Sequence, residues 1–325
     1  MKDIERVLIV GAGAVGAAIA SIIHRAQPES LAVLAEGERI QRYSKDGFIV
    51  NGERLHFRIV APGDANSVCG GESYDLIILA VKNHHLDSAL HQMGGFVGPR
   101  TTILSLLNGI SSEDRIGSLY GPGPGSPENA RLPPYAMILG IDAVRVDNAT
   151  NFASPGKIFF GDKTNTKGSF SLRVQRIARF LEKVGIPFEV PEDMLRALWY
   201  KFMINVGINQ ASAVLRLPYR TFQILPEARN AMEAPMREVI ALSQAMDIGL
   251  NETDLLNWEK TLAKLHPENL TSMCQDVLAG RKTEVELFAG AVVELGRMHG
   301  VPTPANALYF NQLRTIECSY GDCKA

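Results

Sequence analysis

Apolar runs alternate with helical segments through the first half of the chain. The runs are rich in Val, Ile and Leu, with polar residues mainly at their ends, which is typical of strands buried on both faces of a parallel sheet. Four runs are therefore predicted as strands: 6–10, 31–36, 74–82 and 101–109. Residues 14–26 and 86–97 are predicted as the helices between them. This alternation indicates an α/β fold.

Further patterns occupy the stretch before residue 190. Residues 47–60 alternate around a turn-like Asn-Gly-Glu and predict a β-hairpin. Residues 135–162 predict strands that close the sheet in antiparallel fashion, and residues 170–185 predict an amphipathic helix. The segment 121–134 is rich in Gly, Pro and Ser and is predicted as a loop or insertion.

Helical patterns dominate from residue 191 onward. They are predicted at 191–215, 227–248, 252–264, 272–279 and 282–299. We place a domain boundary in the connection 186–193 and divide the chain into residues 1–190 and 191–325. The expected architecture is an α/β N-terminal domain followed by an all-α C-terminal domain.

Composition narrows the class of protein. The 325 residues suffice for two domains. A net charge of −2 and a pI near 6.4 argue against a nucleic-acid partner, because such proteins usually carry a basic excess. No apolar stretch has the length of a membrane span or of a signal peptide's core. The four cysteines are scattered without a C-x-x-C pair, so we expect a reduced, cytoplasmic protein without a metal site.

A glycine-rich turn follows the first predicted strand. Residues 11–16 have the G-x-G-x-x-G pattern and lead directly into a helix, which is the context of a dinucleotide-binding motif. Gly11 would permit the tight turn, Gly13 the approach of a pyrophosphate, and Gly16 close packing of helix on strand. A glycine turn of another α/β fold is the alternative. The motif in this context predicts a Rossmann-type domain that binds a dinucleotide.

Other residues extend this candidate cofactor site. Ala14 and Val15 open the helix after the turn, where free N–H groups and the helix dipole favour an anion. Glu36 stands 20 residues beyond the last glycine, where an acid would bond the ribose hydroxyls. Lys82 and Asn108 stand at the ends of the next two predicted strands. Ligands of open α/β sheets bind outside such ends.

The apolar segment 198–215 carries four polar residues. On a helix that turns by roughly 100° per residue, they fall within an arc of about 80° on one face. They are Lys201, Asn205, Asn209 and Ser212. Buried polar groups need partners, so this stripe either meets other polar groups of the protein or lines a cavity for a polar ligand. A lysine that reaches solvent beside two structural amides would produce the same pattern.

A second polar cluster lies within residues 266–301. Ser272 and Gln275 have the spacing of a capping box, so an N-cap would explain Ser272. Glu284 follows the break at Gly280 and stands in the first turn of the next expected helix, where the helix dipole favours a negative charge. Taken alone, each of these residues has a structural explanation.

Together these motifs resemble those of the ketopantoate reductase (2-dehydropantoate 2-reductase) family over nearly the whole chain. The matching segments are 11–16, 80–82, 106–109, 201–214, 269–284 and 299–304. The segments 201–214 and 269–284 are the specific ones, whereas glycine-rich turns are shared by many dehydrogenases. The resemblance implies a second domain similar to the C-terminal domain of 6-phosphogluconate dehydrogenase.

The resemblance also implies an activity, which is NAD(P)H-dependent reduction of ketopantoate to pantoate for coenzyme A synthesis. Lys201 would be the general acid that protonates the developing alkoxide, and Glu284 would hold the substrate hydroxyl and orient the lysine. The implied substrate-binding residues are Asn205, Asn209, Ser272 and Asn269. Asn108 would lie near the nicotinamide and Lys82 on the cofactor side. A lysine in a largely apolar helix should have a lowered pKa, which suits an acid near neutral pH.

Three features depart from the family pattern. Glu36 stands where many members carry a basic residue for the 2′-phosphate of NADP, and an acid there favours NAD. Arg39 and Arg42 lie just beyond it, so NADP(H) is the implied cofactor and NAD(H) stays open. Tyr219 stands where some members place a polar amide that contacts the substrate. The segment 121–134 has no clear counterpart.

Two other functions fit parts of the same pattern. A related dehydrogenase for another small 2-keto acid would retain Lys201 and Glu284 equally well. A non-catalytic nicotinamide-binding regulatory protein is disfavoured, because a pure binder needs no proton donor beside its ligand. For the assembly we expect a monomer or homodimer, with a small-molecule substrate and neither nucleic acid nor membrane as a partner.

Overall fold

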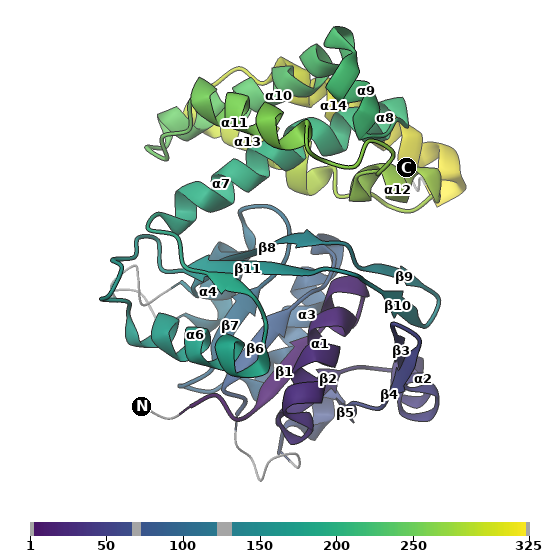
Figure 1. Ribbon diagram of the computed structural model, residues 1–325, viewed down its shortest axis with the longest axis vertical. Helices are drawn as coiled ribbons and strands as arrows, with labels where there is room; N and C mark the ends of the chain where they lie inside the picture. The colour runs from purple at the N-terminus through teal and green to yellow at the C-terminus, as the bar shows by residue number, and fades with distance from the viewer. Residues whose placement is uncertain (1–2, 67–72, 122–131, 323–325) are drawn as a thin grey trace. The chain divides into compact units, whose positions relative to one another are not determined.

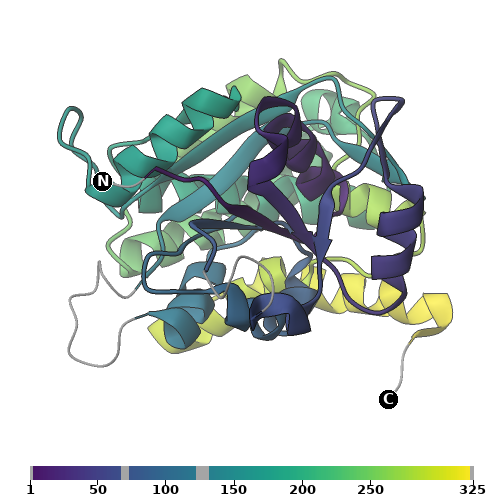
Figure 2. The same cartoon turned by 90° about the horizontal axis from the view of Figure 1, so that it is seen from below.

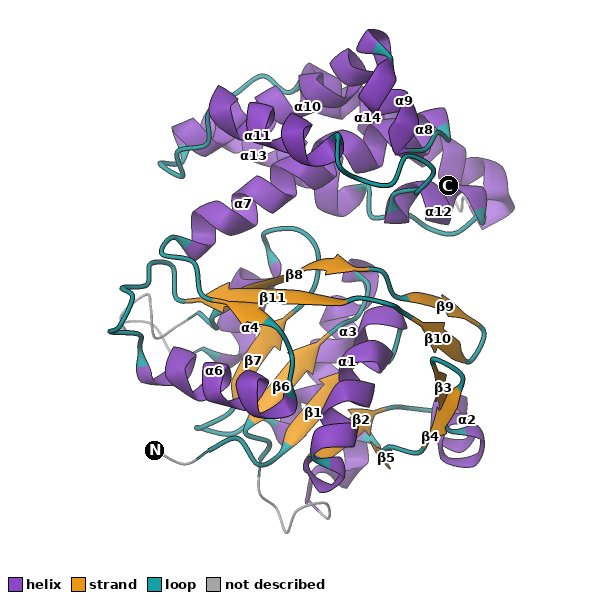
Figure 3. Ribbon diagram, in the orientation of Figure 1, coloured by secondary structure: helices purple, strands orange, loops and turns teal. Residues whose placement is uncertain are grey.

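The computed structural model describes residues 3–66, 73–121 and 132–322. Contacts within the chain divide it into two compact units, Met1–Leu195 and Arg196–Ala325. Every strand found among the described residues lies in the first unit, and the described residues of the second unit form helices joined by loops and turns (Figure 3). The predicted class, an α/β Rossmann-type part followed by an all-α part, is confirmed.

Five parallel strands form the central sheet of the first unit, in the order β5-β2-β1-β6-β7 (Figure 1). They are β1 (Val7–Val10), β2 (Leu31–Leu34), β5 (Arg58–Val60), β6 (Leu76–Leu79) and β7 (Thr102–Ser105). The chain starts in the middle strand, runs outward through β2 and β5, and then adds β6 and β7 on the other side of β1. The winding therefore reverses between β1 and β6, where doubly wound sheets bind ligands outside the carboxyl ends of the strands.

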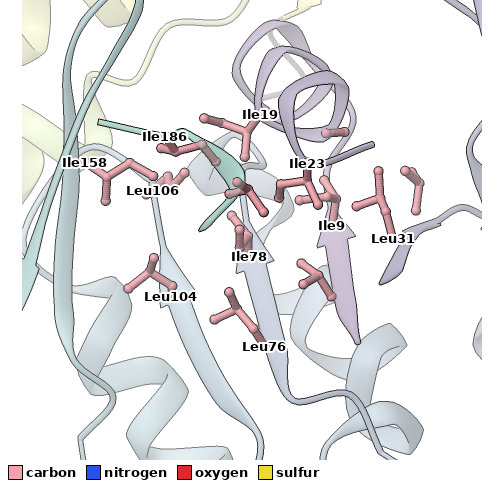
Figure 4. Close-up of a cluster of buried hydrophobic side chains, with 14 of the residues drawn as sticks. Ile9, Ile19, Ile23, Leu31, Leu76, Ile78, Leu104, Leu106, Ile158 and Ile186 are labelled. Atoms are coloured by element: carbon pink, nitrogen blue, oxygen red, sulfur yellow. The ribbon is translucent and has the colours of Figure 1, made fainter. Parts of the chain in front are cut away.

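Helices cover both faces of this sheet. They are α1 (Ala14–Ala26) and α6 (Leu172–Val184) on one face, and α3 (Leu86–Met93) and α4 (Ser112–Tyr120) on the other. On the first face, Ile9 and Ile78 of the strands pack with Ile19 of α1 (Figure 4). Successive strand side chains point to opposite faces. Both faces therefore need apolar residues, which explains the continuous apolar runs.

The predicted hairpin at 47–60 is only partly right. The strands β3 (Phe48–Val50) and β4 (Glu53–Leu55) pair in antiparallel fashion, joined by Asn51 and Gly52 with φ of 49° and 81°. Two positive φ values are what the tight Asn-Gly hairpin turn requires. The residues beyond them instead form β5, which pairs in parallel with β2. The helix α2 (Glu38–Asp46) and this hairpin lie at the same side of the first unit (Figures 1 and 2).

The strands within 135–162 do not close the central sheet, so that prediction was wrong. They are β8 (Tyr135–Ile141), β9 (Val144–Val146), β10 (Ala149–Asn151) and β11 (Pro155–Gly161). β8 and β11 form a separate sheet with β12 (Phe188–Glu189), whereas β9 and β10 extend the hairpin as the sheet β4-β3-β10-β9. Ile138 and Ile158 nevertheless join the core cluster beneath α1 and α6. These strands reach the core by side-chain packing and not by hydrogen bonding to β7.

The second unit consists of helices and short turns. Its α-helices are α7 (Met194–Ile204, which begins in the first unit), α8 (Gln210–Leu215), α9 (Tyr219–Ile224), α10 (Pro226–Ala245), α11 (Glu252–Leu262), α12 (Ser272–Leu278), α13 (Ala291–His299) and α14 (Pro304–Glu317). The described residues of this unit also form three π-helical turns. They are η6 (Asn205–Asn209) between α7 and α8, η7 (Glu286–Gly290) before α13, and η8 (Cys318–Asp322) after α14. The helical prediction is confirmed, but 191–215 is not one plain α-helix.

The cysteines differ in state. Cys274 is a buried free thiol, as a reduced protein would have. Cys318 is disulfide-bonded, which corrects the expectation that every cysteine is reduced. Cys69, Cys323 and most of the predicted loop 121–134 lie outside the described residues. Within the described residues, no helix has the length and apolar character to cross a membrane, and no three acidic, His or Cys side chains gather as metal ligands.

Glu113 is a buried carboxyl group at the start of α4. Its carboxyl oxygens accept from Ser112 Oγ at 2.9 Å and from the N–H of Ala136, in β8, at 3.4 Å. Burial raises the pKa of Glu113 from 4.5 to about 7, although these hydrogen bonds oppose the shift. The native state therefore binds this proton more tightly than the unfolded chain does. The protonated carboxyl group of Glu113 therefore contributes fully to the free energy of unfolding below about pH 4.5, and this contribution is lost as the pH rises to about 7.

The substitution Glu113→Gln is expected to remove this loss of stability at higher pH. At about pH 8 the variant should be more stable than the wild type by up to about 3 kcal/mol, because no buried carboxylate is formed. At about pH 5 the two proteins should differ little. Thermal unfolding at the two pH values measures the difference, and Glu182→Gln on the exposed face of α6 is the matched control. An equal change at both pH values would contradict the argument.

Candidate active site

The glycine-rich turn joins the carboxyl end of β1 to α1. Gly11 has a φ of +99°, and a Cβ there would lie 2.6 Å from Cγ1 of Val81. A Cβ on Gly16 would lie 1.9 Å from the carbonyl oxygen of Gly11. A Cβ on Gly13, by contrast, would meet nothing within 4 Å among the described residues. Gly11 and Gly16 are therefore required by the path of the chain, whereas the space beside Gly13 is open among the described residues.

Alanine substitutions are expected to separate these roles. Gly16→Ala should lower the free energy of unfolding by about 1–3 kcal/mol, because backbone must move away from the new methyl group. Gly13→Ala should leave it within about 0.5 kcal/mol. The same methyl group should weaken dinucleotide binding about tenfold or more, since it would stand between the backbone and a pyrophosphate. Thermal unfolding and fluorescence titration with NADPH and NADH measure both effects. Unchanged binding by Gly13→Ala would remove Gly13 from the site.

The other candidate cofactor residues lie at the same edge of the sheet. Ala14 and Val15 form the first turn of α1, whose N–H groups have no intrahelical acceptors. Glu36 is exposed two residues after β2 ends, and Lys82 is exposed three residues after β6 ends. Asn108 is half-buried three residues after β7. Because the strands are parallel, their carboxyl ends bring the turn and these residues to one edge.

The helical segment with the polar stripe contains a π-helical turn. η6 spans Asn205–Asn209 and widens the helix between α7 and α8. Nδ2 of Asn209 lies 3.5 Å from Oδ1 of Asn205, so the two amides do share one face as the spacing predicted. Asn209 is buried and Asn205 is half-buried. Single π-helical turns occur frequently at functional sites, and the sequence carries no local signal for this one.

Lys201 is buried within this segment, with 8% of its surface exposed. Burial lowers the pKa of Lys201 to about 8, and the nearby negative charge of Glu284 partly opposes that shift. Glu284 is equally buried, just before η7. The segments are also joined by the rings of Phe202 and Phe288, whose centroids lie 6.4 Å apart. The structure thus brings together two charged residues that lie far apart in the chain.

The loop that carries Glu284 is held by α14. Oε1 of Glu317 accepts from the backbone N–H of Thr283 at 2.7 Å and from its hydroxyl at 2.5 Å. Arg314 donates to Glu317 at 3.0 Å and to Glu286 at 3.1 Å. Glu317 was not identified from the sequence, because no motif links it to a residue 34 positions earlier. It restrains the backbone directly before Glu284.

Ser272 is not the N-cap of α12, so that structural explanation was wrong. Thr271 is the N-cap, and its Oγ1 accepts from the N–H of Cys274 at 3.1 Å. Cys274, and not Glu or Gln, stands three residues after Thr271, so the capping-box pattern did not indicate this cap. Ser212 lies 2.6 Å from Oγ1 of Thr271 and is fully buried. Ser212 therefore links α8 to α12 through this hydrogen bond. Its hydroxyl is occupied there and does not line a cavity together with the other polar residues of the helix. The side chain of Ser272 is exposed and available for another role.

Asn269 and Tyr219 are neighbours in the structure. The backbone N–H of Tyr219 donates to the carbonyl oxygen of Asn269 at 3.1 Å. The side chain of Asn269 is exposed, whereas Tyr219 is partly buried at the start of α9. Burial raises the pKa of the Tyr219 hydroxyl above its usual value, so it stays protonated near neutral pH. A departure from the family pattern thus lies directly beside a candidate substrate residue.

Comparisons with known proteins agree with this architecture. The family model described as "Ketopantoate reductase PanE/ApbA" matches residues 7–164, and "Ketopantoate reductase PanE/ApbA C terminal" matches residues 193–317. The 2-dehydropantoate 2-reductase of Aquifex aeolicus (strain VF5) is 26% identical over 318 residues, which cover 97% of each chain.

Two solved structures are similar over most of their length. A PanE/ApbA family ketopantoate reductase from Ralstonia eutropha JMP134 has a TM-score of 0.79 and 23% identity, covering 97% of this chain and 99% of that one. D-mandelate dehydrogenase, in a ternary structure with NADH and anilino(oxo)acetate, has a TM-score of 0.81 and 20% identity over the same shares. At these identities the two structures bear on the fold alone.

The fold and the two family matches define an oxidoreductase with a Rossmann-type unit followed by a helical unit. The chain belongs to the ketopantoate reductase family, because the matched residues lie in both units and cover most of its length. The resemblance inferred from the glycine-rich turn and the two C-terminal segments is thereby confirmed.

Proposed function

We propose that this protein is a 2-dehydropantoate 2-reductase, which reduces ketopantoate to pantoate with NAD(P)H in pantothenate and coenzyme A biosynthesis. The observation that carries the proposal is the buried pair of Lys201 and Glu284, with the pKa of Lys201 lowered to about 8. A lysine with that pKa is protonated at neutral pH and still able to give up its proton. We assign cofactor binding to the first unit and the substrate and catalytic residues to the second.

The chemistry follows from the charge that develops on the substrate. A reduced nicotinamide, when bound, would supply a hydride to the keto carbon, so that negative charge would develop on the keto oxygen. The Lys201 ammonium stabilises that oxygen and donates a proton to it, forming the alcohol. Glu284 accepts a hydrogen bond from the substrate hydroxyl and partly compensates the buried ammonium. Asn205, Asn209, Ser272 and Asn269 are the proposed donors and acceptors for the remaining polar groups of the substrate.

The first unit fits a dinucleotide. The backbone at Gly13 is open, and the first turn of α1 presents N–H groups at Ala14 and Val15, which suit a pyrophosphate. Lys82 and Asn108 stand at the carboxyl ends of the next strands, where the nicotinamide half would lie. We propose NADP(H) as the cofactor and NAD(H) as the alternative that the acid Glu36 favours. The similar D-mandelate dehydrogenase was solved with NADH, which supports a nicotinamide cofactor.

The second candidate function is reduction of a bulkier 2-keto acid. It is favoured by Tyr219, an aromatic residue bonded through its backbone to Asn269, and by the similarity to D-mandelate dehydrogenase. The pair of Lys201 and Glu284 would serve either substrate. A non-catalytic nicotinamide-binding protein would not need this buried charged pair, so that alternative is disfavoured.

One assay tests these functions. Oxidation of NADPH and of NADH by the purified protein is followed with ketopantoate or with benzoylformate, the 2-keto acid that corresponds to mandelate. Preferred turnover of ketopantoate would support the proposal, and preferred turnover of benzoylformate would replace it by the second candidate. Nucleotide binding without turnover of either acid would contradict both candidate functions. Sedimentation velocity of the same preparation distinguishes the monomer from the homodimer, which we propose as the two possible assemblies.

A further inference from the structure

Gln210 is the first residue of α8 and directly follows the π-helical turn η6. It is fully buried in the second unit. Its backbone N–H donates to the carbonyl oxygen of Gly207, whereas in a continuous α-helix it would donate to that of Val206. The side chain uses this second acceptor instead, because Nε2 of Gln210 donates to the carbonyl oxygen of Val206 at 2.7 Å. Gln210 thus bonds the π-helical turn through its side chain.

A buried network fixes the orientation of the Gln210 amide. Nδ2 of Asn306, in α14, donates to Oε2 of Glu238 at 2.7 Å and to the carbonyl oxygen of Pro235 at 3.2 Å. Both partners are acceptors, so the remaining polar atom of the Asn306 side chain is its oxygen. Nε2 of Gln210 donates to this oxygen, Oδ1, at 3.1 Å. The Gln210 side chain therefore has to present its NH₂ group to Asn306 and to the turn.

Glu238 anchors this network at the start of α14. Its carboxylate oxygens accept from the backbone N–H groups of Ala305 at 2.6 Å and of Asn306 at 3.0 Å. Such N–H groups lie in the first turn of a helix, where they have no intrahelical acceptors and where a negative charge is favourable. One chain of hydrogen bonds through Glu238, Asn306 and Gln210 therefore joins α10, α14 and η6.

The network leaves one buried atom of Gln210 without a partner. Its Oε1 has no hydrogen-bond partner among the described residues. An unpaired buried oxygen lowers stability, because it loses its hydrogen bonds to water and gains none in return. Stability alone therefore does not account for a glutamine at this position, and its role lies in the turn that it bonds.

That turn sets the directions of the proposed substrate amides. Asn205 and Asn209 are the first and last residues of η6. In a continuous α-helix, the eight positions from Lys201 to Asn209 would separate the two side chains by about 80° around the axis. A single π-helical turn accommodates about one additional residue, which reduces this separation to about 20°. The turn thus brings Asn209 nearly in line with Lys201, so that both can face one small molecule.

We propose that Gln210 is a positioning residue, which stabilises η6 through its side chain and so holds the amide of Asn209 in line with the Lys201 ammonium. Asn306 and Glu238 act behind it by fixing its orientation. The role rests on the proposed function, because it requires that Lys201 and Asn209 act on the same 2-keto acid. The polar stripe of the sequence does not include Gln210, because position 210 lies about 180° from Lys201 on an ideal α-helix.

The substitution Gln210→Met tests this role, because methionine has a similar length but no hydrogen-bond donor. KM for the preferred 2-keto acid is expected to rise about tenfold or more, since the bonds that hold the turn are lost. The catalytic constant should change less than about threefold, because Lys201 lies in α7 before the turn. Dissociation constants for NADPH and NADH should also stay within about threefold, because the glycine-rich turn belongs to the first unit. Steady-state kinetics and fluorescence titration measure these changes.

The substitution Ser243→Ala is the matched control for a loss of stability. Ser243 is fully buried in α10, and its Oγ accepts from the backbone N–H of Leu250 at 3.1 Å and donates to the carbonyl oxygen of Ile240 at 2.7 Å. Its removal should lower the unfolding temperature and leave KM unchanged. If Gln210→Met behaves in the same way, with a lower unfolding temperature and an unchanged KM, Gln210 is a structural residue and the positioning role is overturned.

The substitution Asn306→Ala reaches the same turn from α14. It should raise KM as Gln210→Met does, and the double variant should raise KM no further, since both residues act through one chain of hydrogen bonds. Turnover by the wild type with an unchanged KM in both single variants would overturn the positioning role alone. Failure of the wild type to reduce either 2-keto acid would contradict the proposed function, and the positioning role with it.

Discussion

Replacement of Lys201 by alanine is expected to lower kcat by about 10²–10⁴-fold, the usual contribution of a positioned general acid. The ammonium would be lost both as the proton donor and as the charge that stabilises the developing alkoxide. Dissociation constants for NADPH and NADH should stay within about threefold, because the proposed cofactor residues all lie in the other unit. Steady-state kinetics with ketopantoate and fluorescence titration with each nucleotide measure the two effects.

The pH dependence of the wild type provides an independent test of the same role. Because the pKa of Lys201 is lowered to about 8, kcat should be highest below that pH and fall as the lysine loses its proton above it. Lys264→Ala, an exposed lysine after α11, is the matched control and should leave kcat and its pH profile unchanged. A Lys201→Ala variant with the wild-type rate would exclude this lysine from the mechanism.

Replacement of Glu284 by glutamine is expected to shift the alkaline limb of the rate profile to lower pH. The negative charge of Glu284 opposes the effect of burial on Lys201, so its removal should lower the pKa of Lys201 below about 8. A shift of one unit makes the lysine ten times less protonated at the alkaline end. Loss of the bond to the substrate hydroxyl should lower kcat/KM by about 10–100-fold in addition. Kinetics between about pH 6 and pH 9 measure both.

Glu286→Gln is the matched control, because Glu286 is exposed two residues later and bonds Arg314. It should leave the pH profile in place. The double variant Lys201→Ala, Glu284→Gln should be little slower than Lys201→Ala alone, since the two residues act as a unit. Fully multiplicative losses, or a profile that stays at the wild-type pH in Glu284→Gln, would show that the carboxylate does not act through the lysine.

Most helices and strands of the fold could be predicted from local sequence patterns. The helix 14–26 was predicted with the bounds that α1 has, because a strand, a glycine turn and a helix follow one another within 20 residues. The four predicted strands are present, and each is shorter than predicted at one end or both. The failures concern residues whose partners are distant in sequence. Polar and apolar residues alternate along β5 as they would in one strand of a hairpin. β5 instead pairs with the edge of β2, which no local pattern indicates.

The features of the candidate site likewise fall into those that depend on residues close in the sequence and those that depend on distant ones. The sequence by itself determined the residue types, the conformation of Gly11 and the shared face of Asn205 and Asn209, because these depend on backbone dihedrals and helical spacing within a few residues. It also sufficed to indicate the family, since the specific motifs are contiguous.

Only the tertiary structure decided how the charged groups of the site are coupled. It lowered the pKa of Lys201 through burial, with Glu284 opposing that shift, and it placed the carboxylate of Glu317 within hydrogen-bonding distance of Thr283. Such couplings depend on distance and on exclusion of water, which are properties of chain segments packed together. No periodicity within one segment records them, because each partner belongs to a different element of the fold.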